Sequence, residues 1–261
     1  MRRLAHRRAG DGPRPVVLLH GFLGSARNLS TLARGLAARD PGLGVVALDL
    51  TGHGASPPLP PGADSATLAG DVLATAGALG LDRPLALVGH SLGGRVALRV
   101  AGQAPAQVRS VTLLDIAPGP LGGDGETARV LAIVQQAPET FRSRGEARAR
   151  LLAGGLAPGL ADWLLLNLEP AGDAYRWRVD RGALAALHER IAVEDLWPVI
   201  ERPRDWALAC VRGGASPYVR EDDALRIEAA GGRVTTLDGV GHFLHAERPA
   251  AVLDAVAAGL D

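Results

Sequence analysis

The segment 89–94, Gly-His-Ser-Leu-Gly-Gly, constrains the fold of this chain more than any other. It follows a short apolar run, 85–88, and precedes a segment with the apolar spacing of a helix. A strand, a sharp turn and a helix with Ser at the apex form a nucleophile elbow. Gly89 and Gly93 stand where Cβ atoms would clash in so tight a turn. The helix N-terminus beneath the apex offers N–H groups and partial positive charge to a developing oxyanion, so Ser91 is predicted to be a nucleophile.

Strands and helices alternate along most of the chain, which has 261 residues. This alternation predicts an α/β fold with a mostly parallel central sheet and helices on both faces. The length suits one large domain that carries an insertion. The predicted strands are 15–19, 44–50, 85–88, 108–115, 206–211 and 233–237, and the predicted helices are 28–38, 66–79, 95–101, 219–230 and 249–260.

The character of the sequence changes after residue 116. From 117 to 203 we find no strand pattern, only helical patterns interrupted by Gly and Pro. We therefore expect an α/β core made of 1–116 and 204–261, with 117–203 inserted as a helical lid. Five of the chain's nine Trp, Tyr and Phe residues lie in this segment. Trp163 and Trp177 are expected either to line a substrate pocket or to form the core of the lid itself.

Composition excludes several classes of function. The formal net charge is zero, so nothing favours nucleic acid or an anionic membrane surface as a partner. No apolar run is long enough to span a membrane, and no apolar stretch of the signal-peptide kind follows the basic N-terminal residues. The single cysteine, Cys210, is consistent with a reducing compartment, and we expect the cytoplasm. No His or Cys cluster has metal-ligand spacing, so neither a metal nor another cofactor is expected.

A serine hydroxyl needs a base to remove its proton. His242 follows the last predicted strand, at the edge of the sheet where the elbow also lies, and it is the candidate base among seven histidines. The others are expected to be structural or to lie in the N-terminal arm or the lid. Two backbone N–H groups should form the oxyanion hole: that of Leu92, after the nucleophile, and that of Phe22, in the turn after the first buried strand.

The acidic partner of His242 is the least obvious residue. In most chains with this elbow it follows the strand after the lid, but here Ser216 stands at that place and cannot carry a negative charge. Asp222 and Asp223 lie within a predicted helix, and Asp238 lies on the wrong side of a short turn. Asp115 ends the strand that follows the elbow helix and is the better candidate, with a helix cap or an anchor for the lid as the alternative role.

Six segments also carry a family resemblance: residues 20–25, 89–94, 115–118, 177–179, 213–219 and 241–249. With them the chain resembles the α/β-hydrolase esterases of the bacterial YbfF type and the related mammalian abhydrolase-domain 11 proteins. Asp-Ile-Ala-Pro at 115–118 and Gly-Gly-Ala-Ser-Pro-Tyr-Val at 213–219 are specific to that family. The resemblance implies a carboxylesterase or thioesterase for short to medium acyl chains, without metal or cofactor, whose acid is Asp115. One departure is Thr-Gly-His-Gly at 51–54, where relatives often carry Arg-Asn-His-Gly.

Three functions remain open from the sequence. The first is a serine carboxylesterase in which Ser91 attacks an ester or thioester and water resolves the acyl-enzyme. The second is a lyase of the menaquinone-pathway type, which shares the Ser-Leu-Gly-Gly-Arg elbow at 91–95. Ser216 argues against it, because those lyases resemble enzymes that carry the acid at the usual place, after the strand that follows the lid. The third is a ligand-binding protein that uses the fold without catalysis. The acyl length, the alcohol group and the oligomeric state are not determined by the sequence.

Overall fold

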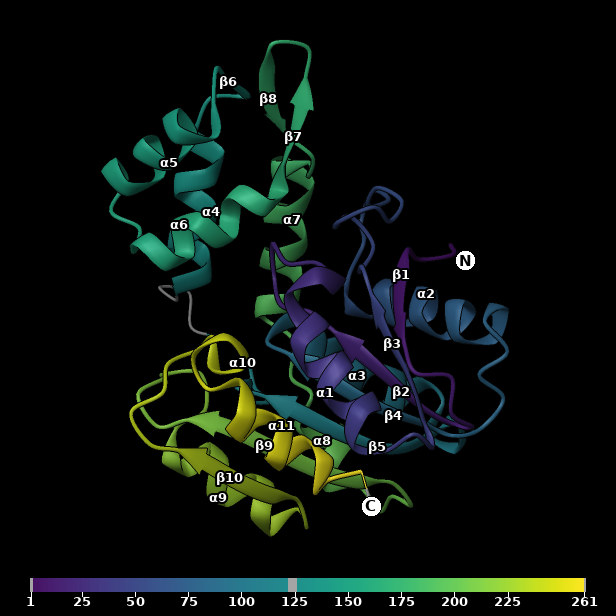
Figure 1. The fold of residues 1–261 in the computed structure, drawn as a ribbon. Coiled ribbons are helices and arrows are strands. Elements are labelled where there is room, and N and C mark those ends of the chain that lie inside the picture. Colours follow the sequence, from purple (N-terminus) through teal and green to yellow (C-terminus); the bar gives the residue numbers. More distant parts are fainter. Residues whose placement is uncertain (1, 122–125, 261) are drawn as a thin grey trace.

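A seven-stranded sheet forms the centre of the computed structural model, which describes residues 2–121 and 126–260 (Figure 1). Its strand order is β1-β3-β2-β4-β5-β9-β10, and every pairing is parallel except that of β1 with β3. The predicted α/β fold is therefore confirmed. The strands are β1 (His6–Ala9), β2 (Arg14–Leu19), β3 (Leu43–Leu48), β4 (Leu85–His90), β5 (Val108–Leu114), β9 (Ala207–Gly213) and β10 (Arg233–Leu237).

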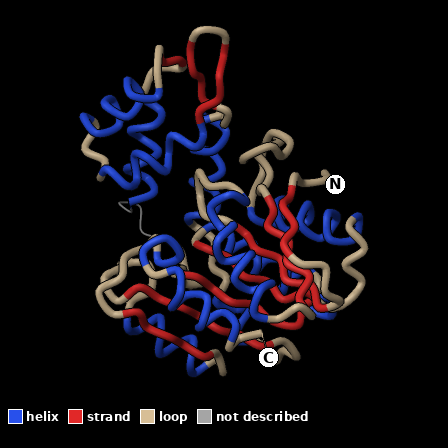
Figure 2. Tube along the Cα trace, viewed as in Figure 1, coloured by secondary structure: helices blue, strands red, loops and turns tan. Residues whose placement is uncertain are grey.

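Helices cover both faces of the sheet, as the helix and strand colours of Figure 2 show. Residues of β2 alternate between the two sides because successive side chains of a strand point to opposite faces. Val16 and Leu18 belong to a hydrophobic core cluster that includes residues of α1 and α11. Val17 and Leu19 belong to a second cluster that includes residues of α2, α3 and α9. These helices are α1 (Ser30–Arg39), α2 (Ser65–Ala78), α3 (Leu92–Gln103), α9 (Glu221–Ala229) and α11 (Pro249–Ala257).

The segment 117–203 leaves the sheet after β5 and returns to it at β9; we call it the insertion. Most of it stands apart from the sheet as a separate lobe (Figure 1). Its described elements are α4 (Glu126–Gln136), β6 (Thr140–Phe141), α5 (Arg144–Ala153), α6 (Pro158–Leu164), the 3₁₀ turn η3 (Leu165–Asn167), β7 (Leu168–Ala171), β8 (Ala174–Trp177), α7 (Arg181–Ala192) and α8 (Trp197–Glu201).

The expectation that the insertion contains no strand is wrong. β6, β8 and β7 form a small antiparallel sheet. The two-residue turn Gly172-Asp173 joins β7 to β8, and Gly172 has φ +62°, a left-handed conformation that a hairpin turn of this length requires. From the sequence alone, the glycines of this segment are expected in general to interrupt helical patterns. β1 was missed as well, because its four residues are mostly exposed and carry no apolar alternation.

One side chain of α3 holds both ends of the insertion. Arg95 is 1% exposed, and its Nη1 donates to the carbonyls of Ala117 (3.4 Å) and Gly119 (2.6 Å). Its Nη2 donates to the carbonyls of Ile191 (3.1 Å) and Glu194 (2.6 Å). Burial lowers the pKa of this guanidinium to about 10, so it remains charged at neutral pH. α3 and the two ends of the insertion thus form one hydrogen-bonded unit.

Candidate active site

The chemistry-bearing loops meet at the carboxyl edge of the sheet. The chain passes from β2 to β3 on one side and then to β4 on the other, so the ends of β2 and β4 lie next to each other at the point where strand order reverses. Such a reversal point is the usual ligand site of an open α/β sheet. Leu19 is paired with Gly89, which places the turn at Phe22 beside the turn at Ser91.

Ser91 stands at the apex of a strained turn between β4 and α3. Its φ and ψ are +50° and −115°, a conformation that residues with a Cβ rarely adopt. A Cβ at Gly89 would lie 2.2 Å from the carbonyl oxygen of Gly93, and one at Gly93 would lie 2.2 Å from that of Leu19. Both glycines are therefore required by close backbone approach, as the sequence predicted. Ser91 is 6% exposed and lies at the N-terminus of α3.

The structure brings Asp115 and His242 into direct contact. His242 Nδ1 lies 2.8 Å from Asp115 Oδ2, and the ring N–H donates to this carboxylate. That bond fixes the tautomer and leaves Nε2 of His242 as a proton acceptor. His242 and Ser91 line the same cavity. The three residues come from the ends of β4 and β5 and from the loop after β10.

Two further donors hold the Asp115 carboxylate, which is 0% exposed. The backbone N–H of Gly213 donates to its Oδ1 at 2.8 Å, and the Ser216 hydroxyl donates to its Oδ2. Asp115 itself has φ +52°, a left-handed conformation that Asp and Asn tolerate better than most residues. Sequence reasoning noted Ser216 only as a residue unable to act as the acid; its contact with that acid was missed.

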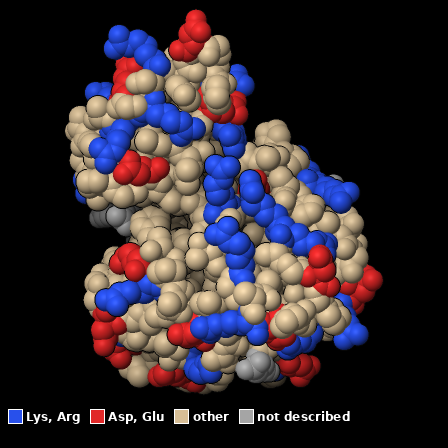
Figure 3. Space-filling model, in the orientation of Figure 1, with Lys and Arg blue, Asp and Glu red and all other residues tan. Residues whose placement is uncertain are grey.

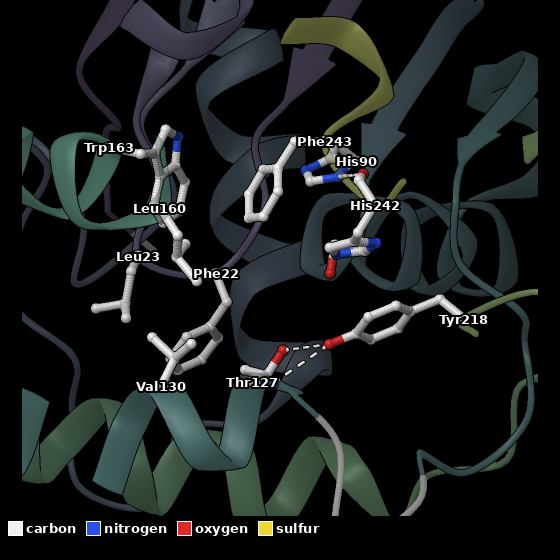
Figure 4. A pocket seen from close by; sticks show the side chains of 11 residues that line it. Phe22, Leu23, His90, Thr127, Val130, Leu160, Trp163, Tyr218, His242 and Phe243 are labelled. Carbon is white, nitrogen blue, oxygen red and sulfur yellow. Dashed lines mark hydrogen bonds between the residues drawn. The ribbon is translucent and has the colours of Figure 1, made fainter. Parts of the chain in front are cut away.

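Tyr218 was also missed. Its ring stacks on His242, with ring centroids 3.8 Å apart and an interplanar angle of 20°. Its hydroxyl lies 2.9 Å from Thr127 Oγ1 and accepts from the Thr127 backbone N–H at 3.3 Å (Figure 4). Tyr218 thereby connects the catalytic histidine candidate to α4 of the insertion. Its position two residues after Ser216, in a segment specific to the resemblance, was the available sequence signal.

His90 and His245 pack beside His242. His90 Nε2 donates to the carbonyl of His242 at 2.9 Å, and the His90 and His245 ring centroids are 4.5 Å apart. Burial lowers the pKa of His245 to about 4 and that of His90 well below its usual value. Both rings are therefore neutral near pH 7 and serve packing and loop position, which agrees with the structural role expected for them.

The turn after β2 contains Phe22, whose N–H is the second oxyanion donor expected from the sequence. Gly24 N donates to the carbonyl of Gly21 at 3.0 Å, which closes a four-residue turn containing Phe22. Within residues 2–121 and 126–260, the backbone N–H groups of Phe22 and Leu92 have no protein acceptor. Both residues and Ser91 line one small cavity. The two N–H groups are therefore candidate donors to a ligand beside Ser91.

A narrow cavity of about 30 Å³ adjoins Ser91; we call it the Ser91 cavity (Figure 4). Trp163 lines it and packs against Phe243, with ring centroids 5.4 Å apart. Trp177 is not among the described lining residues: its Nε1 donates to the Pro138 carbonyl at 3.0 Å inside the insertion. The cavity is lined by Phe22, Leu23, His90, Ser91, Thr127, Val130, Leu160, Trp163, Tyr218, His242 and Phe243.

The cavity lies where the insertion faces the core. In the space-filling view the surface is hollowed between these two parts, and the walls of the hollow are mainly uncharged (Figure 3). Among the residues that the structure describes, no group of three or more His, Cys, Asp or Glu is placed to hold a metal ion. No helix within the described ranges is long and apolar enough to cross a membrane.

Comparisons with known proteins identify the family of the chain. The model of the alpha/beta hydrolase family matches residues 16–255. The mouse protein sn-1-specific diacylglycerol lipase ABHD11 is 29% identical over 256 residues, covering 95% of this chain and 81% of the relative. Esterase YbfF of Escherichia coli K12 is 28% identical over 244 residues, covering 93% and 91%. A marine microorganism esterase has the same fold, with a TM-score of 0.88 and 23% identity over 99% of this chain and all of that one. The names of the relatives support hydrolase activity, and the chain belongs to the alpha/beta hydrolase family.

Proposed function

We propose that the chain is a serine carboxylesterase that hydrolyses esters or thioesters of short to medium acyl chains. The observation that carries the proposal is the 2.8 Å contact between His242 Nδ1 and the buried Asp115 carboxylate, in a cavity that Ser91 also lines. A base whose tautomer is fixed by a carboxylate, next to a serine at a helix N-terminus, is the arrangement of nucleophilic acyl transfer.

Acylation then proceeds as follows. His242 Nε2 takes the proton of the Ser91 hydroxyl while Oγ bonds to the acyl carbon. Negative charge moves to the carbonyl oxygen, which accepts hydrogen bonds from the backbone N–H groups of Phe22 and Leu92. Asp115 stabilises the imidazolium that forms on His242. His242 returns its proton to the leaving alcohol or thiol, and the acyl group remains on Ser91.

Deacylation repeats these roles with water as the nucleophile. His242 removes a proton from water, hydroxide adds to the acyl carbon, and collapse of the second tetrahedral intermediate releases the acid and restores the Ser91 hydroxyl. Hydrolysis therefore requires no group beyond these side chains, the two backbone donors and water. The small-molecule ester or thioester is the only partner that this proposal needs.

The insertion is proposed to be a lid over a core made of 1–116 and 204–261. Val130 of α4 and Leu160 and Trp163 of α6 face the core residues Phe22 and Phe243 across the Ser91 cavity (Figure 4). About 30 Å³ is room for about two water molecules, so this conformation suits short acyl groups. A medium chain extends beyond this cavity or requires α4 or α6 to move outward.

The test is hydrolysis of p-nitrophenyl esters by the wild type and by Ser91→Ala. The variant should lose activity by several orders of magnitude with an unchanged melting temperature, because only one hydroxyl is removed. A matched assay for pyruvate release separates the lyase alternative. Near-wild-type ester hydrolysis by Ser91→Ala, or pyruvate release without ester hydrolysis, would contradict the proposal.

A further inference from the structure

The turn that carries Phe22 contains a strained residue. Leu23 is the third residue of the turn closed by the bond from Gly24 N to the Gly21 carbonyl, and its φ is +58°. This left-handed conformation suits Gly or Asn at that position and is unfavourable for a leucine. Such a strained conformation persists only where contacts with the surrounding structure hold it in place. The support for Leu23 must therefore come from contacts outside the turn.

A side chain of the insertion supplies that support. Asn167 Nδ2 donates to the carbonyl oxygen of Leu23 at 2.7 Å across a sequence separation of 144 residues. Asn167 is 4% exposed, and Leu23 is also buried. Because both residues are buried, loss of the donor would leave the Leu23 carbonyl unsatisfied at a cost in stability.

Asn167 is itself held firmly. The backbone carbonyl of Asn167 accepts from the backbone N–H of Arg178 at 2.8 Å. Arg144 donates through Nη1 to the carbonyl of Leu165 at 2.7 Å and through Nη2 to that of Leu168 at 2.9 Å, so one guanidinium bonds the backbone on both sides of Asn167. The amide donor is thus fixed by α5 and by the residue that follows β8, both within the insertion.

The Leu23 carbonyl that Asn167 holds lies in one peptide plane with the Gly24 N–H, and the Gly21 carbonyl that accepts from Gly24 lies in one plane with the Phe22 N–H. His20 Nδ1 also donates to the Gly21 carbonyl, at 2.8 Å, so two bonds set the direction of the Phe22 N–H. Loss of the Asn167 bond loosens the one that runs through Gly24. An oxyanion donor acts only when it is aimed at the oxyanion before the reaction. The ring of Phe22 packs edge-on against His53 and His188, which restrains the side chain but makes no hydrogen bond to the turn's backbone.

We infer that Asn167 is a positioning residue for the oxyanion hole: the insertion holds Leu23 in its strained conformation and thereby keeps the Phe22 N–H aimed at the substrate. The inference rests on the proposed function, because it assigns an oxyanion hole to Phe22 and Leu92. It gives the insertion a part in catalysis as well as in covering the Ser91 cavity.

The experiment compares Asn167→Asp with the wild type on p-nitrophenyl acetate. The aspartate keeps the shape of the side chain but replaces the N–H donor by an oxygen that repels the Leu23 carbonyl. We expect kcat to fall roughly 10- to 100-fold, part of the loss that follows removal of an oxyanion donor, with KM changed by less than about threefold. Affinity for butylboronic acid, whose adduct with Ser91 mimics the tetrahedral intermediate, should fall by a similar factor.

Arg181→Lys is the matched control. Arg181 Nη1 donates to the Val134 carbonyl at 2.9 Å inside the insertion, so this variant weakens the insertion without a contact to the turn at 21–24. It should lower the melting temperature but leave kcat and boronate affinity unchanged. If Asn167→Asp does not fold, Asn167→Ala removes the same donor without introducing a buried charge.

The inference would be overturned if a folded Asn167 variant kept the wild-type kcat and boronate affinity and showed only a lower melting temperature, as Arg181→Lys is expected to do. The proposed function is checked separately in the same preparation, because ester hydrolysis by the wild type and its loss in Ser91→Ala do not depend on Asn167.

Discussion

Replacing Asp115 by asparagine is expected to remove most of the activity while keeping the fold. Asparagine is nearly the same size, and it tolerates the left-handed backbone that Asp115 adopts at φ +52°. Its carbonyl oxygen can still accept from Gly213 N, as Asp115 Oδ1 does at 2.8 Å, and its amide can donate to the Ser216 oxygen. The free energy of unfolding should therefore fall by only about 1–2 kcal/mol.

The catalytic loss should be much larger. The amide N–H₂ would stand where Asp115 Oδ2 now accepts from His242 Nδ1 at 2.8 Å. A donor in that place favours the tautomer with the proton on Nε2, and this tautomer cannot take the proton of Ser91. Loss of the carboxylate in the best-studied serine protease lowers kcat by about 10⁴, which corresponds to about 5.5 kcal/mol of transition-state stabilisation. We expect kcat to fall by about the same factor here.

Steady-state hydrolysis of p-nitrophenyl acetate and thermal melts by circular dichroism measure the two quantities. Asp71→Asn is the matched control, since Asp71 is also buried at 4% exposure and accepts from Arg2 N and Thr51 Oγ1, each at 2.8 Å, away from the Ser91 cavity. It should change stability and not kcat. Ser216→Ala should cost less than about tenfold, because Asp115 keeps its other two donors. A folded Asp115→Asn enzyme with activity within about tenfold of the wild type would refute the assignment, although Ser91 and His242 would stand.

Two further predictions concern the cavity and acid stability. Trp163→Ala should extend hydrolysis to longer acyl chains because it enlarges the Ser91 cavity, whereas Trp177→Phe should lower only the melting temperature; the same chain-length profile in both variants would contradict this. The melting temperature should also fall between pH 6.5 and about 4, because burial lowers the pKa of His20 and His245 to about 4. In this pH range the unfolded chain binds protons at these two histidines that the folded chain does not bind. Protonation of each ring therefore lowers the free energy of unfolding by up to about 3 kcal/mol. A melting temperature that stays constant from pH 7 to 5 would count against this prediction.

The sequence predicted the sheet and the elbow well because both depend on local signals. Buried parallel strands appear as short apolar runs, and the predicted strand 233–237 agrees with β10 at both ends. The elbow depends on glycines at fixed spacing around Ser91, which close backbone approach demands. Asp115 was chosen because it ends a strand at the right edge of the sheet, and the structure places its carboxylate beside His242. The catalytic roles of these residues stay predictions.

The missed features depend on contacts between distant parts of the chain. Tyr218 was missed because stacking on His242 arises only when the loops after β9 and β10 meet. Asn167 bonds Leu23 across 144 residues, and no local pattern distinguishes such an asparagine from one in an exposed turn. The hairpin of β7 and β8 was missed because its strands are four residues long and alternate weakly in burial. Trp177 was expected to line a pocket or to form the core of the lid, and residue type alone could not decide; its indole N–H bonds within the insertion.

The Arg95 contacts have a consequence for recombination between relatives. Lids of hydrolases are attractive parts to exchange when a new substrate range is sought. Here four carbonyls of the insertion, two near its start and two towards its end, accept from a single guanidinium on α3. A foreign lid without matching carbonyls would leave that cation buried and unsatisfied, at a cost of about 3 kcal/mol or more. We therefore expect a working exchange to transplant the insertion and α3 together.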